Sequence, residues 1–285
     1  MRIVLFGNNR QREKSRYVSR IVERLQVLDV DVLVEEEFRE FLLDLGAIAP
    51  TLPALNGRLS EADMVISVGG DGTFLSTAAK VGAHQIPILG VNTGHLGFLA
   101  DVSPEDIDES LERLVNGQYT VQERNVIQVE KEGSPLENYP FALNEVAVTK
   151  HEQSSVIAVE TRVNGELLNN YLADGLIVCT PTGSTGYSLS VGGPIIDNTS
   201  ESLCISAVAP HAMSVRPVIL RDDVEITLRV KSRTNKFLIA VDGRCESHSA
   251  DTLITLRKAD YKVRVVKIQH PSFFDTLRDR MLWGK

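Results

Sequence analysis

Strand and helix patterns alternate through the first hundred residues. Short apolar runs at 3–6, 31–34, 64–68 and 86–91 have the character of buried strands. Apolar side chains at helical spacing fill 15–28 and 73–82, and a further helical stretch ends at Gly46. Strands that alternate with helices indicate a parallel sheet covered on both faces. The sequence therefore predicts an α/β N-terminal domain.

From residue 119 to about 268 the pattern changes to short β-branched runs. Asn164-Gly165 and Asp242-Gly243 each separate two such runs and predict hairpins. We expect an all-β C-terminal domain built as a two-sheet sandwich. A helical pattern at 272–282 is expected to return to the first domain. We place the boundaries at 1–117 with 270–285 for the α/β domain, and at 118–269 for the β domain.

The charge balance excludes several classes of partner. The 285 residues fit two domains at about 150 residues each. With 30 Lys and Arg against 38 Asp and Glu, the net charge of -8 argues against nonspecific binding to nucleic acid or anionic membranes. No apolar run reaches the roughly 18 residues of a membrane span. The three distant cysteines, without a CxxC pair, predict a reducing cytoplasm, and the six histidines show no paired ligand spacing for a metal.

The segment Gly69-Gly70-Asp71-Gly72-Thr73 follows the third predicted strand and opens a helix. Glycines let a backbone approach a ligand closely, and the free N–H groups of a helix N-terminus attract phosphate. A carboxylate at Asp71 would repel phosphate unless a metal ion or a proton-accepting role explains it. A tight turn or helix cap is the alternative. The segment matches neither the P-loop nor the GxGxxG dinucleotide fingerprint, whose sixth position here is Leu75.

Two further polar segments interrupt the β-rich region. Asn144-Glu145 lies between apolar runs, where a buried polar pair would need partners, and a bulge or strand end is the alternative. The loop 180–187, Thr-Pro-Thr-Gly-Ser-Thr-Gly-Tyr, offers small hydroxyls and backbone access for phosphate or ribose. An ordinary Ser/Thr turn is its alternative. Tyr187 is suited either to stacking on a ring or to the core.

A third glycine-containing loop, 89–98, follows the next parallel strand. Because the carboxyl ends of parallel strands meet at one sheet edge, we expect it beside the 69–73 loop. His95 within it carries no functional assignment, since a lone histidine is usually structural.

Taken together, the segments 69–73, 144–145 and 180–187 resemble the NAD kinases in order and spacing over nearly the whole chain. Gly-Gly-Asp-Gly alone is also similar to phosphofructokinases and diacylglycerol-type lipid kinases. The resemblance implies an N-terminal α/β domain, a C-terminal β domain and a homo-oligomer. It further implies transfer of a phosphoryl group from ATP to the adenosine-ribose 2'-hydroxyl of NAD+, which gives NADP+.

The resemblance also implies roles for individual residues. Asp71 is the expected proton acceptor, Asn144 and Glu145 hold ribose, and Asp174 contacts the nicotinamide side, often from a neighbouring subunit. Residues 185–190 frame the adenine. The full NAD-binding expectation comprises Asp71, Gly72, Asn144, Glu145, Asp174, Thr185, Gly186, Tyr187, Ser188, Leu189, Ser190, Ala209 and Arg244. The residues expected in phosphate-binding loops are Gly69, Gly70, Thr73, Thr182, Gly183 and Ser184. Leu172 stands where many family members carry Arg.

The expected cofactor is Mg2+ or another divalent cation that arrives with ATP, and polyphosphate is an alternative donor. The expected assembly is a homodimer or homotetramer, with no nucleic acid or membrane partner. Two other functions stay open on the sequence. One is a kinase of a lipid or sugar alcohol in the same superfamily, and the other is a dinucleotide-binding sensor without turnover.

Overall fold

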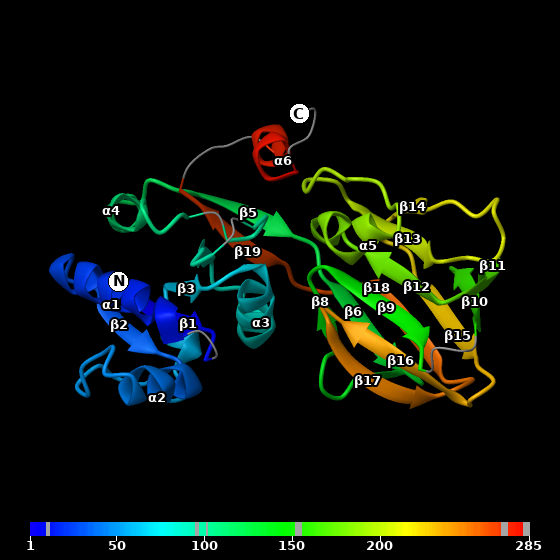
Figure 1. Ribbon diagram of the computed structural model, residues 1–285, viewed down its shortest axis with the longest axis horizontal. Coiled ribbons are helices and arrows are strands. Elements are labelled where there is room, and N and C mark those ends of the chain that lie inside the picture. The colour runs from blue at the N-terminus through cyan, green and yellow to red at the C-terminus, as the bar shows by residue number, and fades with distance from the viewer. Residues whose placement is uncertain (10–11, 95–96, 101, 152–155, 269–272, 282–285) are drawn as a thin grey trace. The chain divides into compact units, whose positions relative to one another are not determined.

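The computed structural model describes residues 1–9, 12–94, 97–100, 102–151, 156–268 and 273–281. It contains two compact units, Met1–Glu123 with Val263–Lys285, and Arg124–Lys262 (Figure 1). Among the helices in the described ranges, none is long and apolar enough to cross a membrane.

The first unit is built on a six-stranded sheet with the strand order β2-β1-β3-β4-β19-β5. Its strands are β1 (Arg2–Gly7), β2 (Asp31–Val34), β3 (Met64–Val68), β4 (Ile88–Val91), β5 (Thr120–Arg124) and β19 (Val263–Lys267). Strand β1 pairs in parallel with β2 and β3, β4 with β3, and β19 with β4. The predicted parallel α/β domain is confirmed.

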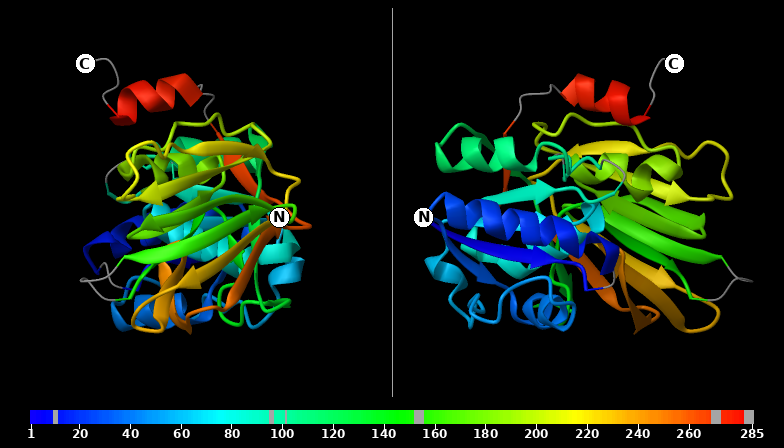
Figure 2. Two further views of the ribbon diagram at one scale, coloured as in Figure 1. Left: turned by 90° about the vertical axis from the view of Figure 1, so that its right-hand side faces the viewer. Right: turned by 60° about the vertical axis from the view of Figure 1, so that its left-hand side comes forward.

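Helices cover both faces of this sheet (Figures 1 and 2). Helices α1 (Ser15–Val27), α2 (Glu36–Asp44) and α4 (Ile107–Val115) share one apolar core with strand residues such as Ile3 and Ile66. Helix α3 (Asp71–Val81) lies on the opposite face, where the hydroxyls of Thr77 and Ser67 are 3.0 Å apart. Alternate strand residues point to opposite faces, so Ile66 and Ser67 divide between the two layers. The remaining helical elements of this unit are the 3-10 turns Arg12–Lys14, Leu59–Glu61 and Gly82–His84, and α6 (Phe273–Met281).

The second unit consists of two antiparallel sheets. The first contains β6 (Ile127–Lys131), β7 (Ser134–Pro135), β8 (Phe141–Ala142), β10 (Ile157–Val163), β11 (Glu166–Ala173), β15 (Ile226–Lys231) and β18 (Leu253–Lys258). The second contains β9 (Glu145–Lys150), β12 (Gly175–Cys179), β13 (Ser202–Val208), β14 (Val218–Arg221), β16 (Lys236–Val241) and β17 (Arg244–Ser249). Apolar side chains from both sheets form one core, which includes Val159 and Leu228 from the first and Val148 and Ile239 from the second. The predicted sandwich is confirmed.

Both predicted hairpins are present. Asn164 and Gly165 have φ of 50° and 82° between β10 and β11, and Asp242 and Gly243 have φ of 48° and 79° between β16 and β17. Positive φ at two central residues matches the twist of the flanking strands. The predicted C-terminal helix is also present, as α6, and belongs to the first unit.

Two strands lie in a different sheet from the one predicted. The segments 120–124 and 263–267 fall inside the predicted β domain, but β5 and β19 belong to the six-stranded sheet of the first unit, where β19 pairs in parallel with β4. Val265 of β19 pairs with Ile88 of β4 and is fully buried. The pattern of β19 reports burial and not the identity of the partner strand, and the mostly polar and exposed β5 gives no signal for either sheet.

Candidate functional site

The Gly69–Thr73 loop connects the end of β3 to the first turn of α3. Gly69 is buried, and a Cβ there would lie 2.7 Å from the Cβ of Thr73, so the loop requires glycine at this position. Its N–H donates to the carbonyl of Val91 at 2.9 Å, which ties the loop to the end of β4. Gly70 precedes the helix without a side-chain cap. The first turn of α3 therefore keeps N–H groups that a ligand can bind.

The Asp71 carboxylate holds the loop that follows β4. Its Oδ2 accepts a hydrogen bond from the N–H of Phe98 at 2.7 Å, and its Oδ1 accepts from Leu99 at 3.0 Å and Ala100 at 3.1 Å. The predicted position of the 89–98 loop beside the 69–73 loop is confirmed by the contacts of Phe98 with Asp71 and of Val91 with Gly69. His95 lies outside the described residues. A carboxylate offers about four lone-pair sites, so Oδ2, with one donor, keeps capacity for a further hydrogen bond.

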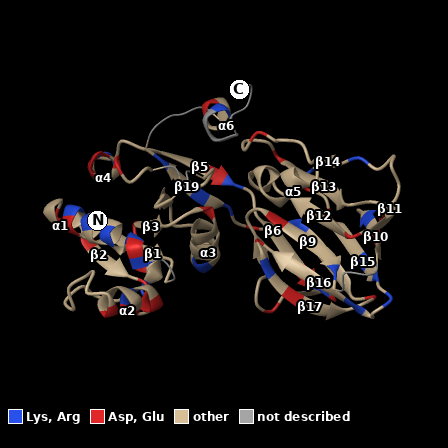
Figure 3. Cartoon of the chain, viewed as in Figure 1, with Lys and Arg blue, Asp and Glu red and all other residues tan. Residues whose placement is uncertain are grey.

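A cavity of about 490 Å³ opens beside this loop. Its lining residues are Gly7, Asn8, Asn9, Glu37, Gly72, Thr73, Ser76 and Lys80. In the order β2-β1-β3, the connection after β1 leads to a strand on one side of it, and β3 lies on its other side. Open α/β sheets bind ligands at such a switch point, beside the carboxyl ends of the strands. Lys80 Nζ lies 2.5 Å from Oε1 of the buried Glu35 and 3.9 Å from Oε2 of Glu37. Lys80 supplies positive charge at this cavity. Figure 3 shows that acidic and basic segments are otherwise interspersed over both units.

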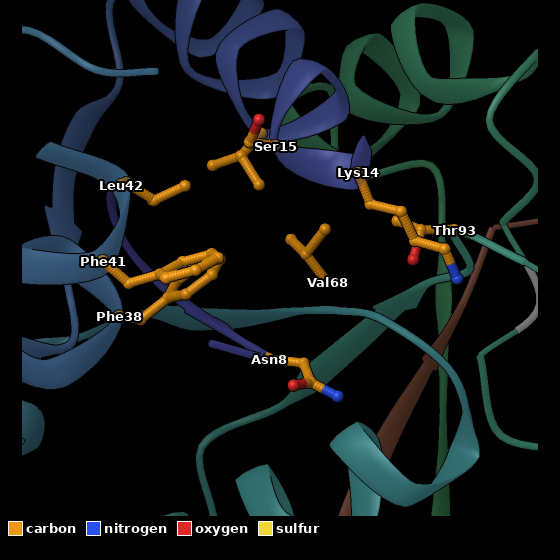
Figure 4. A pocket seen from close by; sticks show the side chains of 9 residues that line it. Asn8, Lys14, Ser15, Phe38, Phe41, Leu42, Val68 and Thr93 are labelled. Carbon is orange, nitrogen blue, oxygen red and sulfur yellow. The ribbon is translucent and has the colours of Figure 1, made fainter. Parts of the chain in front are cut away.

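A second hollow in this unit holds at most one water molecule. Its volume is about 10 Å³, and Phe38, Phe41, Leu42 and Val68 form its apolar side (Figure 4). Lys14 and three other polar residues lie around it. A space of this size is a packing defect and not a ligand site.

In the second unit, Asn144 and Glu145 lie where β9 begins. The side chain of Asp242 accepts hydrogen bonds from the backbone N–H groups of Leu143 at 2.8 Å, Asn144 at 2.8 Å and Glu145 at 3.1 Å. The N–H of Asp242 donates to the carbonyl of Glu145 at 3.0 Å. The local sequence around Asp242 predicts only a turn residue, because its partners lie 97 to 99 residues away and leave no local signal.

The 180–187 loop packs directly on this pair. Thr180 donates from its N–H to the carbonyl of Asn144 at 2.9 Å and from its hydroxyl to the carbonyl of Leu143 at 2.6 Å. A Cβ on Gly183 would overlap the Asn144 carbonyl, so glycine allows the two segments to touch. Ser184 is fully buried, donates to the carbonyl of Pro181 at 2.6 Å and accepts from Ile196 N–H at 3.0 Å. The Ser184 hydroxyl therefore closes the loop on itself, and the Thr180 hydroxyl ties the loop to Leu143 while it accepts from the Gly183 N–H at 3.2 Å.

The rest of this loop presents its backbone toward Glu145. Thr182–Thr185 form a 3-10 turn and α5 (Tyr187–Ser190) a single helical turn. The backbone of Tyr187 hydrogen-bonds the Glu145 carboxylate, while the Tyr187 ring is 41% exposed and is not a core side chain. Ser188 is buried, with its hydroxyl 3.3 Å from that of Ser206.

Three polar atoms at this cluster are buried and have no hydrogen-bond partner in the part of the chain that the structure describes. They are Oδ1 of Asn144, Oε2 of Glu145 and Nη2 of Arg244. The Arg244 guanidinium lies 4.7 Å from the ring centre of Tyr139, and its Nη2 is 3.8 Å from Asp242 Oδ2. Unpaired buried polar groups cost free energy, so their gathering indicates a surface built to bind a polar ligand. Burial, and then the charge of Asp242, raise the pKa of Glu145 to about 7.

The remaining expected residues lie at the other end of the same strands. Cys179 pairs with Glu145, whereas Gly175 pairs with Thr149 and Val208, so Asp174 and Ala209 flank the far end of β12. Five strand residues span roughly 17 Å. Asp174 Oδ1 accepts from Lys150 Nζ at 2.8 Å, and Ala209 has a φ of 45°. Within one chain the structure does not bring Asp174 and Ala209 together with Asn144 and Glu145. Leu172, 50% exposed, lies beside them, because its carbonyl accepts from His211 N–H at 2.9 Å.

Comparison with known proteins identifies the family. Sequence models of the ATP-NAD kinase N-terminal and C-terminal domains match residues 3–119 and 143–268. The NAD kinase of Bacteroides fragilis (strain YCH46) is 49% identical over 287 residues, which cover 100% of this chain and 98% of that protein. The chain belongs to the ATP-NAD kinase family. The NAD kinase of Flavobacterium johnsoniae is 40% identical over 290 residues, with 100% and 99% coverage.

Solved structures agree with this family assignment. An NAD kinase from Archaeoglobus fulgidus in complex with ATP superposes with a TM-score of 0.77 at 28% identity, covering 100% of this chain and 98% of that one. Yeast NADH kinase complexed with NADH has a TM-score of 0.87 at 21% identity, covering 100% and 88%, and shares the fold. In this family member the 69–73 loop lies in the N-terminal match, and both polar segments of the second unit lie in the C-terminal match.

Proposed function

We propose that the chain transfers the γ-phosphoryl group of ATP to the 2'-hydroxyl of the adenosine ribose of NAD+, which yields NADP+ and ADP. The observation that carries this proposal is 49% identity along the whole chain to a protein named NAD kinase. The segments 69–73, 144–145 and 180–187 are all present, and the last two touch each other in the second unit. Kinases of other alcohols and nucleotide sensors are not favoured by these comparisons.

Asp71 is the proposed proton acceptor. Its three N–H donors fix the direction of the carboxylate, and Oδ2 keeps capacity for one more hydrogen bond, which suits a ribose hydroxyl. Phosphoryl transfer asks the protein mainly for positioning and charge stabilisation. Asp71 therefore orients the hydroxyl and takes its proton as the new bond forms. The residue also holds the 97–100 loop, so the two tasks share one side chain.

The donor phosphates are proposed to occupy the cavity beside α3. Free N–H groups at the first turn of α3 and the ammonium of Lys80 would face them. Glu35 orients that ammonium at 2.5 Å. A cavity of about 490 Å³ is in the range of small-molecule sites.

The divalent cation is proposed to enter as part of the MgATP substrate. No group of three or more His, Cys, Asp or Glu side chains that could hold a metal ion occurs among the described residues. Mg2+ commonly binds through substrate phosphates with few protein ligands. Polyphosphate presents similar oxygens, so it is a candidate alternative donor.

The acceptor dinucleotide is proposed to bind over Asn144, Glu145 and Arg244. Their unpaired buried atoms supply two acceptors and one donor, which match ribose hydroxyls and a phosphate oxygen. Residues 185–190 add backbone groups and the exposed Tyr187 ring, which is suited to stacking on adenine.

A homodimer or homotetramer is proposed because one chain separates two groups of the expected residues. Asp174 and Ala209 lie one strand length from Glu145, so a second copy is needed to bring them to the same dinucleotide. We propose a reducing cytoplasm as the compartment, since Cys179, Cys204 and Cys245 are all free thiols.

The test is production of NADP+ by the purified protein with NAD+, ATP and Mg2+. No product at saturating substrates would refute the function, and lipid, sugar or polyphosphate substrates would then be compared in the same assay. Sedimentation measures the assembly. Mixing two inactive variants, D71N and D174N, should restore about a quarter of the sites in a dimer whose sites are shared between subunits. If the mixture of D71N and D174N is as inactive as each variant alone, active sites shared between subunits are refuted.

A further inference from the structure

Asp242 has more partners than its turn requires. The residue occupies a left-handed position, with a φ of 48°, where Asn is accepted as readily as Asp. Nevertheless its side chain is 2% exposed, and its carboxylate accepts three consecutive backbone N–H groups. A buried carboxylate is costly unless it is hydrogen-bonded. Burial raises the pKa of Asp242, and the N–H groups of residues 143–145 together with Arg244 oppose that rise, so the carboxylate is stabilised by this segment and not by the turn.

The three N–H donors belong to residues 143–145, the segment that carries the unpaired acceptor atoms. Among the described residues, Asn144 Oδ1 and Glu145 Oε2 have no hydrogen-bond partner, while the backbone of Tyr187 hydrogen-bonds the Glu145 carboxylate. The backbone of Asn144 and Glu145 is held by Asp242, which also donates its N–H to the carbonyl of Glu145 at 3.0 Å. Hydrogen bonds to an ionised acceptor are about twice as strong as neutral ones.

We propose that Asp242 is the positioning residue of the dinucleotide site, which sets Asn144 and Glu145 for NAD+ without touching the nucleotide. This inference rests on the proposed function, in which Asn144 and Glu145 bind NAD+. The backbone anchor sets the position and direction of each Cα–Cβ bond, and so the place from which both side chains extend. A site held in this way does not have to be ordered when the dinucleotide arrives.

The negative charge of Asp242 also affects the pKa of Glu145. The groups that face the Glu145 carboxylate are Asp242 across the anchor, the Tyr187 backbone N–H and the Cys179 thiol on the paired strand. Arg244 contacts Asp242, with its Nη2 3.8 Å from Asp242 Oδ2. Burial is the main cause of the raised pKa of Glu145, and the Asp242 charge raises it further. Removing that charge lowers the pKa of Glu145, which a purely structural role would not require.

The test uses D242N, because Asn keeps the turn geometry and removes the charge. One Asn side chain offers a carbonyl oxygen to two of the N–H groups and turns its own NH2 toward the third. We expect the KM for NAD+ to rise at least about tenfold, the kcat at saturating NAD+ to change by less than about threefold, and the KM for MgATP to stay unchanged. The limb of the kcat/KM profile that follows Glu145 should move to lower pH, and E145Q should lack that limb. D223N, at an exposed Asp paired with Arg221, is the matched control with unchanged activity.

Amide hydrogen exchange without nucleotide separates this inference from the proposed function. The N–H groups of 143–145 should exchange at least about tenfold faster in D242N than in wild type and D223N. If the wild-type chain forms no NADP+, the proposed function fails, whereas faster exchange would still show that Asp242 holds this segment. Unchanged exchange, a KM for NAD+ within twofold of wild type, or an unmoved pH limb would each overturn the inference. A D242N chain that does not fold would reduce Asp242 to a structural residue and overturn it as well.

Discussion

Gly183→Ala tests whether the contact between the 180–187 loop and Asn144 stabilises the second unit. An added Cβ would overlap the Asn144 carbonyl oxygen and lie 2.9 Å from the Asn144 Cα. Every atom involved is backbone, so no side-chain rotation can relieve the overlap. The loop has to move away from the strand that begins at Glu145.

The cost follows from the interactions that this movement removes. Overpacking of a close contact costs about 1–3 kcal/mol. The two Thr180 hydrogen bonds, to the carbonyls of Asn144 at 2.9 Å and Leu143 at 2.6 Å, contribute about 1 kcal/mol each and weaken together with it. We expect the free energy of unfolding to fall by roughly 3 kcal/mol, which corresponds to a lower Tm by about 6–12 °C in a domain of this size.

Gly186→Ala provides the matched comparison three residues further along the same loop. There φ is -96°, and the nearest atom to an added Cβ is Oε2 of the Glu145 side chain at 3.0 Å. A side chain can move by a few tenths of an ångström, and replacing glycine also reduces the entropy of the unfolded chain by about 0.4–1 kcal/mol. We expect the stability of this variant to stay within about 1 kcal/mol of wild type.

Calorimetry and urea unfolding followed by circular dichroism measure both variants, and the KM for NAD+ reports the site. The reasoning would be refuted if Gly183→Ala melted within about 1 °C of wild type. Equal destabilisation by the two substitutions would also refute it, because the Cβ of Gly183→Ala meets backbone atoms, whereas that of Gly186→Ala first meets a movable side chain. A raised KM for NAD+ in Gly183→Ala should accompany the loss of stability.

Three further predictions concern charged groups. Asp71→Asn should abolish turnover while NAD+ still binds by calorimetry, and full activity in a clean preparation would remove its assigned role. Lys80→Met should raise the KM for MgATP and leave the KM for NAD+ unchanged; the opposite pattern would place the donor elsewhere. Because the folded state raises the pKa of Glu145 from 4.5 to about 7, the folded chain holds this proton more tightly, and stability is lost as the pH rises through that window. Between about pH 4 and about pH 8, the free energy of unfolding of wild type should therefore fall by about 3 kcal/mol relative to that of E145Q. Parallel curves of unfolding free energy against pH for the two proteins would contradict this.

Local patterns predict the elements of this fold well. The hairpin turns at Asn164 and Asp242 follow from residues that accept a positive φ, and the strand-helix alternation follows from periodicity within a few residues. The sheet membership of β5 and β19 does not follow, because the buried pattern of β19 contains no record of its neighbour and β5 is mostly polar and exposed. The physical reason is that strand pairing joins backbone groups far apart in the chain, and a local side-chain pattern does not record those partners.

The properties of the candidate site also divide into those set by the sequence and those set by the tertiary structure. The sequence by itself determines the chemistry available: a carboxylate at a helix start, a polar pair in an apolar strand, and a hydroxyl-rich loop. Only the tertiary structure decides which of these groups are free to act. The hydroxyl of Ser184 closes its own loop, that of Thr180 ties the loop to Leu143, and the three N–H bonds to Asp242 join residues 97 to 99 positions apart. Hydrogen bonds between such distant residues leave no periodic signal, because they depend on where the folded backbone places each donor and acceptor.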